Sequence, residues 1–500
     1  MDTAFNKSIN IVWIKRDIRS QDHVALAAAE EHALPYLICY FYEPSLLAYP
    51  DTSKRHLRFI YQSILDLNDK LKQYNQSVHI FHGDAIAIFE NLSQQFKIEN
   101  IYSYQESGTA ITWRRDIAVQ KFCNQRNITW TEFQKDGVQR GITNRKKWDK
   151  HWYATMNKPI LHNEYAKQED LHFQHNFPLA TTLLTDITAV HSRFQPGGET
   201  FAWRYLNSFT EERGKSYHFQ ISKPTESRKS CSRISPYLAW GNLSIKQALH
   251  HVNGSPNYET NKRAFSGMMT RLKWHDHFIQ KFEVECRYEN YCVNQGYETL
   301  EHPINEDFIE AWKTGSTGYP LVDACMRCLH ATGWINFRMR AMVLSFLCHH
   351  LDQDWRHGTY HLARLFLDYV PGIHYPQFQM QAGTTGTNIV RIYNPIKQSQ
   401  EHDPQGVYIR KWIPEMTSVP SAFIHEPWKM TVIEQGIYKV QIGKDYPAPL
   451  IDLKIAGKAA RDKIWGHRKN IKVKQEKQRI LATHVRPNRN KINIERKELD

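Results

Sequence analysis

The sequence predicts a protein of two structural classes, an α/β domain with a parallel sheet followed by an all-α domain. Short apolar strands alternate with helices between residues 11 and 133, a pattern typical of a parallel sheet covered on both faces. Beyond residue 200 the strand pattern stops and helical periodicity continues alone. A chain of 500 residues also exceeds what one hydrophobic core usually supports. The predicted parts are an α/β domain at 1–136, a linker at 137–199, a helical domain at 200–450 and a basic extension at 451–500.

The composition is that of a folded protein with excess positive charge. Hydrophobic residues make up 41% and aromatic residues 12%, which excludes general disorder. The mean hydropathy is −0.61, and no apolar run is long enough to cross a bilayer. The N-terminus has no signal-peptide anatomy, so we expect a cytoplasmic protein without membrane segments. The net charge of +14 favours a nucleic-acid partner but does not establish one.

Much of this charge lies at the C-terminus. Residues 452–500 hold 15 Lys and Arg against 6 Asp and Glu. The segment either screens phosphates or forms a solvated helix with a frayed end, and the sequence favours the two interpretations equally.

The eight cysteines are scattered along the chain and mostly lie in apolar or helical context, which indicates reduced thiols. Cys325 and Cys328 form a single CxxC motif without a second pair. A buried helix face is the favoured interpretation over a metal or redox site, and we predict no metal.

The elements of the α/β domain follow from periodicity. Apolar runs predict strands at 11–14, 36–42, 78–82, 101–104 and 128–133, and helical spacing predicts helices at 24–31, 55–72, 84–96 and 113–126. No GxGxxG or GxxxxGKS/T motif follows a strand, so the usual dinucleotide and P-loop sites are absent. Residues 106–108 (Glu-Ser-Gly) follow the fourth strand, at the edge where such sheets bind ligands, although a plain loop is the favoured interpretation.

The rest of the chain reads as a linker and then helices. Residues 137–199 are irregular and end at Gln-Pro-Gly-Gly, as expected for a long crossing segment. Helices are predicted at 201–213, 244–251, 262–282, 305–313, 319–331, 336–351 and 359–367.

Three stretches of the helical half contain candidate site residues. Residues 230–236 (SCSRISP) offer hydroxyls, amides and one Arg at a helix start, which suits a phosphate, while an ordinary capped helix start fits as well. Residues 382–388 (AGTTGTN) form a turn that either approaches a ligand or simply connects elements. Arg340 and Asp368 lie among aromatic residues and need partners, so they either face a planar, redox-active ligand or tie two core helices together.

The order and spacing of longer motifs resemble the cryptochrome/photolyase flavoprotein family over nearly the whole chain. The matching segments are IVWIKRDIRSQDHVAL (11–26), SCSRISPYLAWGNLS (230–244), AWKTGSTGYPLVDACMRCLHATGWINFRMR (311–340), DWRHG (354–358), RIYNPIKQSQEHDPQGVYIRKWIPEM (391–416) and DYPAPLIDL (445–453). The resemblance implies a Rossmann-like antenna domain, a long linker and a helical domain that holds FAD. It also implies a possible second chromophore, a folate or a deazaflavin, between the α/β domain and the linker.

The resemblance assigns a set of flavin-site residues. Arg340 and Asp368 match the charged pair beside the flavin ring, where a cation favours an anionic flavin. His374 falls where many members have an asparagine opposite flavin N5, and an imidazole there changes flavin protonation and redox poise. Cys231 replaces a usual threonine, and Val370 replaces a second aspartate. The cofactor-binding set is Tyr217, Cys231, Ser232, Arg233, Ile234, Ser235, His275, Arg340, Asp368, Tyr369 and His374.

The electron-relay tryptophans of the family are only partly present. Trp312 and Trp355 match the distal and middle members. Phe378 falls at the position of the flavin-proximal tryptophan, and phenylalanine is hard to oxidise. The relay is therefore broken, or it is rerouted through Tyr375 or another tryptophan.

The lesion pocket implied by the resemblance also departs from the family. Trp274 matches the tryptophan on which a flipped pyrimidine dimer stacks, and Arg338 matches a pocket arginine. Arg271 stands where cyclobutane-dimer photolyases have a glutamate, and Phe337 where they have an asparagine. Ala341 replaces a methionine. We predict catalytic roles for Trp274, Arg271, Phe337, Arg338 and His374.

Two functions remain open. The favoured one is a light-driven lyase that acts as a monomer on UV-damaged DNA, single strands included. It flips a damaged pyrimidine pair out of the DNA and splits it by electron transfer from reduced FAD. The alternative is a cryptochrome-type blue-light receptor, which the altered residues Arg271 and Phe337 favour.

Overall fold

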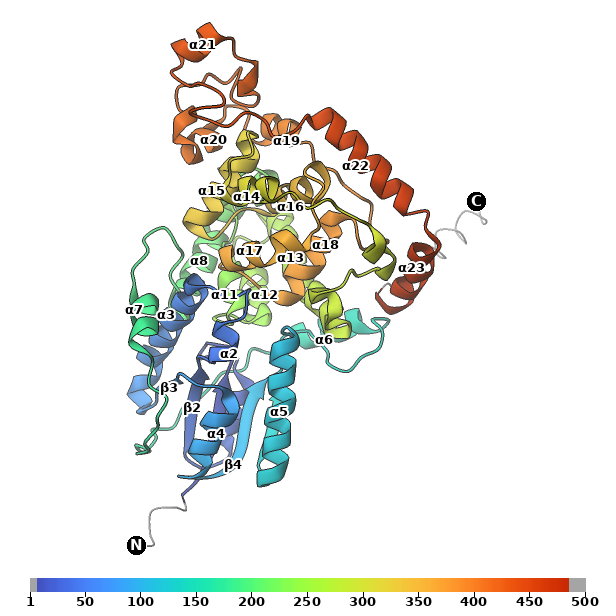
Figure 1. The fold of residues 1–500 in the computed structure, drawn as a ribbon. Coiled ribbons are helices and arrows are strands. Elements are labelled where there is room, and N and C mark those ends of the chain that lie inside the picture. The colour runs from blue at the N-terminus through green and yellow to red at the C-terminus, as the bar shows by residue number, and fades with distance from the viewer. Residues whose placement is uncertain (1–6, 485–500) are drawn as a thin grey trace.

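Residues 7–484 are described by the structure, a computed structural model, and form a parallel sheet domain at one end and a helical region at the other (Figure 1). The sheet has five strands in the order β3-β2-β1-β4-β5, and all neighbours are parallel. The predicted fold class is therefore confirmed. The strands are β1 Ser8–Ile14, β2 Tyr36–Phe41, β3 Val78–Phe81, β4 Lys97–Tyr104 and β5 Thr129–Phe133.

The central strand β1 is buried on both faces because helices cover both sides of the sheet. Ile11 and Trp13 belong to the apolar cluster that includes Phe89 and Phe122 of helices α4 and α5. The alternate residue Val12 belongs to a different cluster with residues of α1 and α3. This period of two explains why the strand reads as a continuous apolar run. The helices of this half are α1 Val24–Glu31, α2 Pro44–Leu47, α3 Lys54–Leu71, α4 Ala85–Ser93 and α5 Ala110–Arg126.

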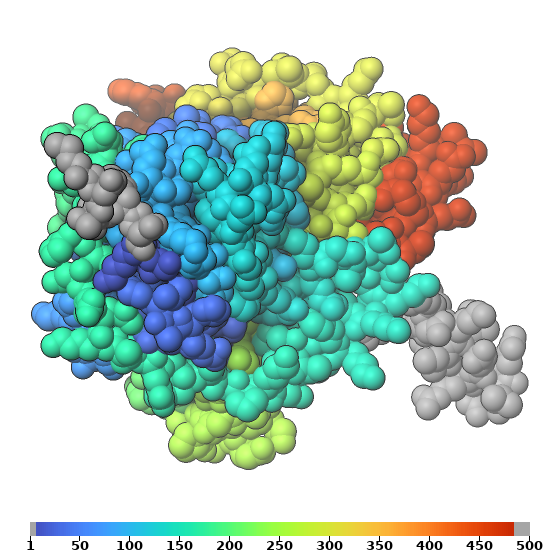
Figure 2. All heavy atoms as spheres, turned by 90° about the horizontal axis from the view of Figure 1, so that it is seen from below, coloured from blue at the N-terminus to red at the C-terminus, as the bar shows by residue number. Residues whose placement is uncertain are grey.

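The linker is more ordered than its irregular sequence predicts, because it contains two short helices, α6 (Trp148–Met156) and α7 (Thr181–Thr188). Figure 2 shows linker residues, in teal and green, on two sides of the α/β half. One carboxylate holds the start of the linker in place. Asp276 Oδ2 accepts hydrogen bonds from the Gly137 amide at 3.0 Å and from Trp152 Nε1 at 2.8 Å.

The second half is helical, as predicted, and no helix within residues 7–484 is both long and apolar enough to span a membrane. The domain boundaries at 136, 199 and 450 stay predictions. The helices are α8 Glu199–Glu211, α9 Tyr217–Gln220, α10 Ser227–Ser230, α11 Ser235–Ala239, α12 Ile245–Asn253, α13 Lys262–Val284, α14 Glu306–Thr314, α15 Pro320–Thr332, α16 Phe337–Ser345, α17 Arg356–Leu365, α18 Pro371–Ala382, α19 Pro395–His402, α20 Val407–Trp412, α21 Val432–Ile437, α22 Leu453–His467 and α23 Ile471–His484.

Two helical predictions need correction. The predicted helix 336–351 ends earlier, at Ser345, and a π-helical turn over Phe346–His350 follows it. Helix α18 was not predicted, because its prolines resemble helix breakers. Pro371 occupies the first turn, where no amide hydrogen is needed, and Pro376 stands inside a helix that buried neighbours hold in place.

The two halves meet where β1 ends. The Ile18 amide donates to the carbonyl of Trp240, and Asn242 Nδ2 donates to the carbonyl of Ile18 at 2.8 Å. Gly241 has φ +75°, and a Cβ there would lie 2.2 Å from the Arg16 carbonyl oxygen. Only glycine therefore lets this turn approach the strand end so closely.

The cysteine pair lies inside the core of the helical half. Cys325 and Cys328 are fully buried on α15, and all eight cysteines are free thiols. Burial raises the pKa of the Cys325 thiol well above its usual range, so the group stays protonated. This placement confirms the predicted buried helix face.

The basic C-terminal segment is docked as far as the structure describes it. Val473 and Ile480 of α23 are buried, and Arg479 Nη1 lies 2.6 Å from Glu285 Oε1. A helix is thus confirmed within the predicted extension. The expected frayed end falls on residues 485–500, which lie outside the described residues.

A buried ion-pair network lies at the carboxyl edge of the sheet, where β1 and β4 adjoin. Glu106 Oε2 is 2.7 Å from Arg115 Nη2, and Glu106 Oε1 is 3.4 Å from Arg16 Nε. Burial alone would raise the pKa of Glu106, but Arg115, Arg16 and Lys15 outweigh it and hold this pKa at about 2. Residues 105–109 have no regular secondary structure, so the predicted loop is confirmed, and Glu106 is in addition a charged member of the network. The alternative of a ligand site there stays a prediction.

We expect Glu106→Gln to destabilise the protein by about 3 kcal/mol at neutral pH, since a carboxyl pKa lowered from 4.5 to about 2 corresponds to that free energy. The difference in unfolding free energy should be complete above pH 4.5 and should shrink as the pH falls toward 2. Urea unfolding at pH 7 and pH 4 measures it. Glu259→Gln removes an exposed pair with Lys262 and serves as the control. A Glu106→Gln difference that is equal at both pH values would contradict the assignment.

Candidate functional site

One cavity of about 230 Å³ in the helical half gathers most of the predicted cofactor-binding residues. Its walls come from α9, the loop before α11, α13, the start of α16 and the segment before α18. These elements are far apart in sequence, so only the fold brings them to one place. The predicted residues that line it are Tyr217, Cys231, Ser232, Arg233, Ser235, His275, Arg340 and Asp368.

The loop at 230–236 does not form an ordinary capped helix start. The N-cap of α11 is Ile234, whose side chain has no hydrogen-bonding atom, and the preceding Arg233 has φ +62°. Arg233 Nη2 donates to Gln195 Oε1 at 2.5 Å, and its guanidinium lies 4.0 Å from the centre of the Trp334 ring. The Cys231 thiol has its pKa raised to about 12 by burial, so it is a neutral, weak donor.

Arg340 and Asp368 form the charged pair that the sequence predicts. Arg340 Nη2 lies 2.7 Å from Asp368 Oδ1, and both side chains are largely buried in the cavity wall. The guanidinium also lies 3.7 Å from the centre of the Phe366 ring. The pair does link α16 to the segment before α18, but it faces a cavity as well. The salt-bridge alternative is therefore confirmed, and the alternative that the pair faces a redox-active ligand stays a prediction.

The polar atoms of the cavity suit a large anionic, heteroaromatic ligand. Arg233 Nε, Arg271 Nε and His275 Nε2 are buried without a hydrogen-bond partner. Buried donors without acceptors are costly, and phosphate or ring oxygen and nitrogen atoms would satisfy them. The donor set thus fits a flavin dinucleotide.

Three predicted cofactor residues, Ile234, Tyr369 and His374, are not walls of this cavity. The His374 ring packs edge-on against Tyr369 and Tyr375, and its Nε2 lies 2.9 Å from the Thr359 carbonyl oxygen. Burial lowers the His374 pKa to about 4, so the imidazole is neutral and Nε2 carries the proton. The sequence-based roles of these three residues stay predictions.

The relay residues are deep in the core. Trp312 is 0% exposed, and its Nε1 donates to the Val343 carbonyl at 2.9 Å. A Cβ added to Gly358 would meet Phe378 Cζ at 2.9 Å and Trp312 Cη2 at 3.0 Å, so these two rings flank the same glycine. Trp355 is also buried, with the Arg356 guanidinium 4.6 Å from its ring centre.

A second cavity, of about 590 Å³, adjoins the first and contains the predicted lesion residues. Arg271, Trp274 and Phe337 line both cavities, and Arg338 lines the second alone. Thr387 and Asn388 of the 382–388 turn also line it, so this turn reaches a cavity and does not merely connect elements.

Two exposed aromatic rings hold a cation between them at the mouth of these cavities. Trp274 is 42% and Phe337 39% exposed. The Arg271 guanidinium carbon lies 4.2 Å from the Trp274 ring centre and 5.8 Å from that of Phe337. Exposed aromatic faces beside a cation are suited to stacking on a nucleobase.

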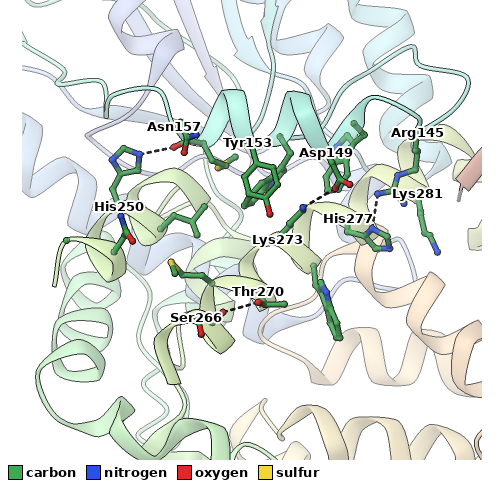
Figure 3. Close-up of a pocket in the computed structure, with 18 of the residues that line it drawn as sticks. Arg145, Asp149, Tyr153, Asn157, His250, Ser266, Thr270, Lys273, His277 and Lys281 are labelled. Atoms are coloured by element: carbon green, nitrogen blue, oxygen red, sulfur yellow. Dashed lines mark hydrogen bonds and ion pairs between the residues drawn. The ribbon is translucent and has the colours of Figure 1, made fainter. Parts of the chain in front are cut away.

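A third cavity, a groove of about 1220 Å³ between α6, α12 and α13, shares Trp274 with the other two (Figure 3). Lys273 of α13 reaches Asp149 of α6 at 3.0 Å, and Arg145 Nη2 lies 2.8 Å from His277 Nδ1. Tyr153 is exposed on the opposite wall. We call this cavity the α6–α13 groove.

The α6–α13 groove is electropositive. Burial and the neighbouring Arg145 lower the Lys281 pKa to about 8, and burial and the nearby cations lower the His277 pKa to about 2. The neutral His277 accepts from the charged Arg145. An approaching anion would relieve the repulsion between these groups.

Apart from Trp274, the residues of the groove were not predicted, although the sequence carries a signal for those on α13. Polar and basic residues recur every three to four positions along α13, at Ser266, Thr270, Lys273, His277 and Lys281. This stripe is visible in the sequence. Arg145 and Asp149 come from the linker, and only the fold brings them opposite the stripe.

Two family models match the chain. The model described as "DNA photolyase" matches residues 10–150, and the model described as "FAD binding domain of DNA photolyase" matches residues 268–466. Together they cover more than half of the chain. The second match contains most of α13, and it contains Arg340 and Asp368 of the cavity walls.

Relatives of known name match nearly end to end. A deoxyribodipyrimidine photo-lyase of Alkalihalophilus pseudofirmus is 29% identical, over 89% of this chain and 95% of the relative. A cryptochrome DASH of Synechocystis is 27% identical, over 90% of this chain and 96% of the relative.

Solved structures of the same two kinds share the fold. A Synechocystis cryptochrome is similar with a TM-score of 0.83 at 24% identity, covering 91% of this chain and 99% of that one. A class III photolyase from Agrobacterium tumefaciens gives a TM-score of 0.81 at 23% identity, covering 94% and 100%. An archaeal photolyase from Sulfolobus tokodaii, solved with two FAD molecules, gives 0.76 at 25% identity, covering 92% and 100%.

Proposed function

Because the chain belongs to the cryptochrome/photolyase flavoprotein family, we propose that it is a light-dependent DNA-repair enzyme that splits UV-damaged pyrimidine pairs. One observation carries the proposal. Trp274 lines the 230 Å³ cavity, the 590 Å³ cavity and the α6–α13 groove at once. A ligand in the first cavity, a flipped pyrimidine dimer in the second and a DNA strand in the groove would thus meet at one indole.

FAD would be held by residues of the first cavity. Arg233, Ser232 and Ser235 are placed to meet its phosphates, and Arg340 with Asp368 to face its ring. Reduced FAD, when bound and excited by blue light, supplies the electron that opens the lesion. The Arg340 guanidinium would favour a negative charge on the ring, and Asp368 would fix the orientation of that guanidinium.

The residues of the second cavity would bind and orient the lesion. Trp274 and Phe337 offer apolar faces for stacking, while Arg271 and Arg338 would donate to lesion carbonyls or phosphates. A lesion bound among these side chains would fill the cavity and displace water from it. Exclusion of water favours electron transfer to the lesion over side reactions.

The α6–α13 groove would carry the DNA strand beside the lesion. Arg145, Lys273 and Lys281 supply positive charge, and Tyr153 with Trp274 supplies exposed rings. Cations interleaved with aromatic faces suit a single strand whose bases are unstacked. We thus propose UV-damaged DNA, single strands included, as the partner.

A blue-light receptor is the second candidate, and one observation favours it. Arg271 covers a face of Trp274 at 4.2 Å, where a base would otherwise stack, and Phe337 lies against the same cation. A lesion must displace Arg271 or use the other indole face. A receptor binds no lesion, so Arg271 can stay on the indole face.

A second chromophore is proposed at the carboxyl edge of the sheet. A cavity of about 110 Å³ lies there among Trp13, Tyr40 and Trp240, beside the Glu106–Arg115 pair. It is smaller than ligand sites usually are, which run to roughly 300–1,000 Å³, so side chains would move to admit a folate or deazaflavin. The absorption spectrum of the purified protein tests for a second pigment beside the flavin.

Illumination of the reduced protein with dimer-containing oligonucleotides tests the repair function. We expect loss of the lesion in light but not in darkness, with a single strand bound at least as well as a duplex. Chromatography of the oligonucleotide measures intact and repaired product.

The same experiment separates the two candidate functions. Cyclobutane dimers and six-four photoproducts are supplied separately, so that either lesion class can respond. A flavin-loaded protein that repairs neither lesion, yet changes its flavin spectrum on illumination, would refute the enzyme proposal and favour the receptor.

A further inference from the structure

A cluster of buried tyrosines and one carboxylate lies directly behind the flavin-type cavity. Tyr369 follows Asp368 and precedes Val370, and both of these neighbours line the 230 Å³ cavity. The Tyr369 side chain instead lines the cavity at the sheet edge. Tyr369 therefore stands in a wall one residue thick between the two cavities.

The phenol of Tyr369 is hydrogen-bonded to a base. Its Oη donates to Asp51 Oδ2 at 2.7 Å, and both residues are buried. Burial, opposed by this hydrogen bond and by Arg16, raises the pKa of Asp51 above its usual range, which makes the carboxylate a stronger proton acceptor. Burial and Asp51 also raise the pKa of Tyr369 well above its usual range, so the phenol keeps its proton at rest.

Other aromatic groups connect Tyr369 with its surroundings. Tyr375 Oη lies 3.4 Å from Tyr369 Oη, so the two phenols are within hydrogen-bond distance of each other. The His374 ring lies 5.2 Å from the Tyr369 ring and 5.5 Å from the Tyr375 ring, on the side of Arg340 and Asp368. On the other side, the His56 ring stacks on Tyr369 at 5.9 Å.

Two residues at the relay positions implied by the family resemblance, Phe378 and Trp355, are less suited to donating an electron. Phe378, which packs on His374 at 5.5 Å, is hard to oxidise and has no proton to give. Trp355 lies under the Arg356 guanidinium at 4.6 Å, and a cation there opposes the positive charge of an oxidised indole. A phenol that releases its proton to a carboxylate as it loses an electron develops no net charge.

We propose that Tyr369, with Asp51 as its proton acceptor, is the residue that gives an electron to the oxidised flavin when light excites it. The Tyr369 O–H bond breaks, the proton forms a bond to Asp51 Oδ2, and the electron passes to the isoalloxazine. Tyr369 is left as a neutral phenoxyl radical. Asp51 returns the proton when an external thiolate supplies the electron that restores the phenol. The inference goes beyond the repair proposal, because it concerns how bound flavin becomes reduced and applies equally to a receptor.

The test uses the flavin-loaded full chain, oxidised, illuminated with an external thiol and followed by flavin absorbance and by electron paramagnetic resonance. We expect Tyr369→Phe to slow photoreduction at least tenfold and to remove a tyrosine radical. In the wild-type protein, ring-deuterated tyrosine should change the hyperfine pattern of that radical, and deuterated tryptophan should not. In the wild-type protein D₂O should slow photoreduction, because a proton moves with the electron. Asp51→Asn should also slow photoreduction, and this variant should no longer respond to D₂O.

The matched control is Tyr446→Phe, which removes another buried tyrosine that donates to a buried aspartate, Asp323, at 2.5 Å. The flavin of this variant should be photoreduced at the wild-type rate. Three results would each overturn the proposal. The flavin of Tyr369→Phe could be photoreduced at the wild-type rate, the radical could respond to deuterated tryptophan, or flavin-loaded wild-type protein could fail to be photoreduced. If Tyr369→Phe fails to hold flavin, Asp51→Asn and the isotope labels carry the test. A wild-type protein that binds no flavin would instead refute the proposed function.

Discussion

Asp368→Ala should leave the purified protein almost without flavin. Asp368 is the ion-pair partner of Arg340, with Nη2 and Oδ1 at 2.7 Å in the cavity wall. Removal of one partner from a buried pair typically costs about 3–5 kcal/mol, because the remaining charge is left uncompensated. The Arg340 side chain would then turn toward other acceptors and lose the position that faces the ligand. We expect FAD affinity to fall by at least about 100-fold, since each 1.4 kcal/mol is a factor of ten.

The FAD content per chain, from the ratio of flavin to protein absorbance, measures this effect. Asp368→Asn keeps the shape and one acceptor and should retain more flavin. The control is Glu415→Ala, which breaks a more exposed arginine–carboxylate pair, with Arg327, elsewhere in the helical half. Folded Asp368→Ala with wild-type flavin content would refute the assignment of this cavity.

Trp274→Ala should lower the affinity for a dimer-containing oligonucleotide by about 5- to 150-fold. Base stacking on an aromatic side chain contributes roughly 1–3 kcal/mol. Trp274 is also the one side chain that lines both main cavities and the α6–α13 groove, so its loss affects the lesion and the strand together. Fluorescence anisotropy with labelled oligonucleotides gives the dissociation constants. FAD content should be unchanged, because the charged pair of the cavity is intact.

The chain offers a close control for this substitution. Trp465 on α22 is 47% exposed, and the Arg468 guanidinium lies 5.0 Å from its ring, much as Arg271 lies over Trp274. Trp465→Ala should leave oligonucleotide affinity unchanged. Equal losses in the two variants would mean that Trp274 acts as a general surface residue, and unchanged affinity in both would remove the proposed lesion site.

Local sequence determined the elements and many of the site residues. The alternation of Ile11 and Trp13 with Val12 defines a strand buried on both faces, since side chains on a strand point to opposite sides. The residues before α11, together with Arg340 and Asp368, were found by their motifs and do line one cavity. By contrast, Pro371 and Pro376 concealed α18, because the sequence cannot show that neighbouring helices hold a proline-containing helix in place.

What the sequence alone determined is the order of the strands and of the longer helices other than α18 and the C-terminal pair, the family resemblance and the identity of the charged pair, because each depends on residues close together or on fixed spacing. Only the tertiary structure decided which distant residues meet. Tyr369 and Asp51 are 318 positions apart, and Arg145 reaches His277 across 132 positions. Such contacts have no local signature, since they depend on how the linker and the helical half pack on the sheet. The polar stripe of α13 was present in the sequence, but its opposite wall existed only after folding.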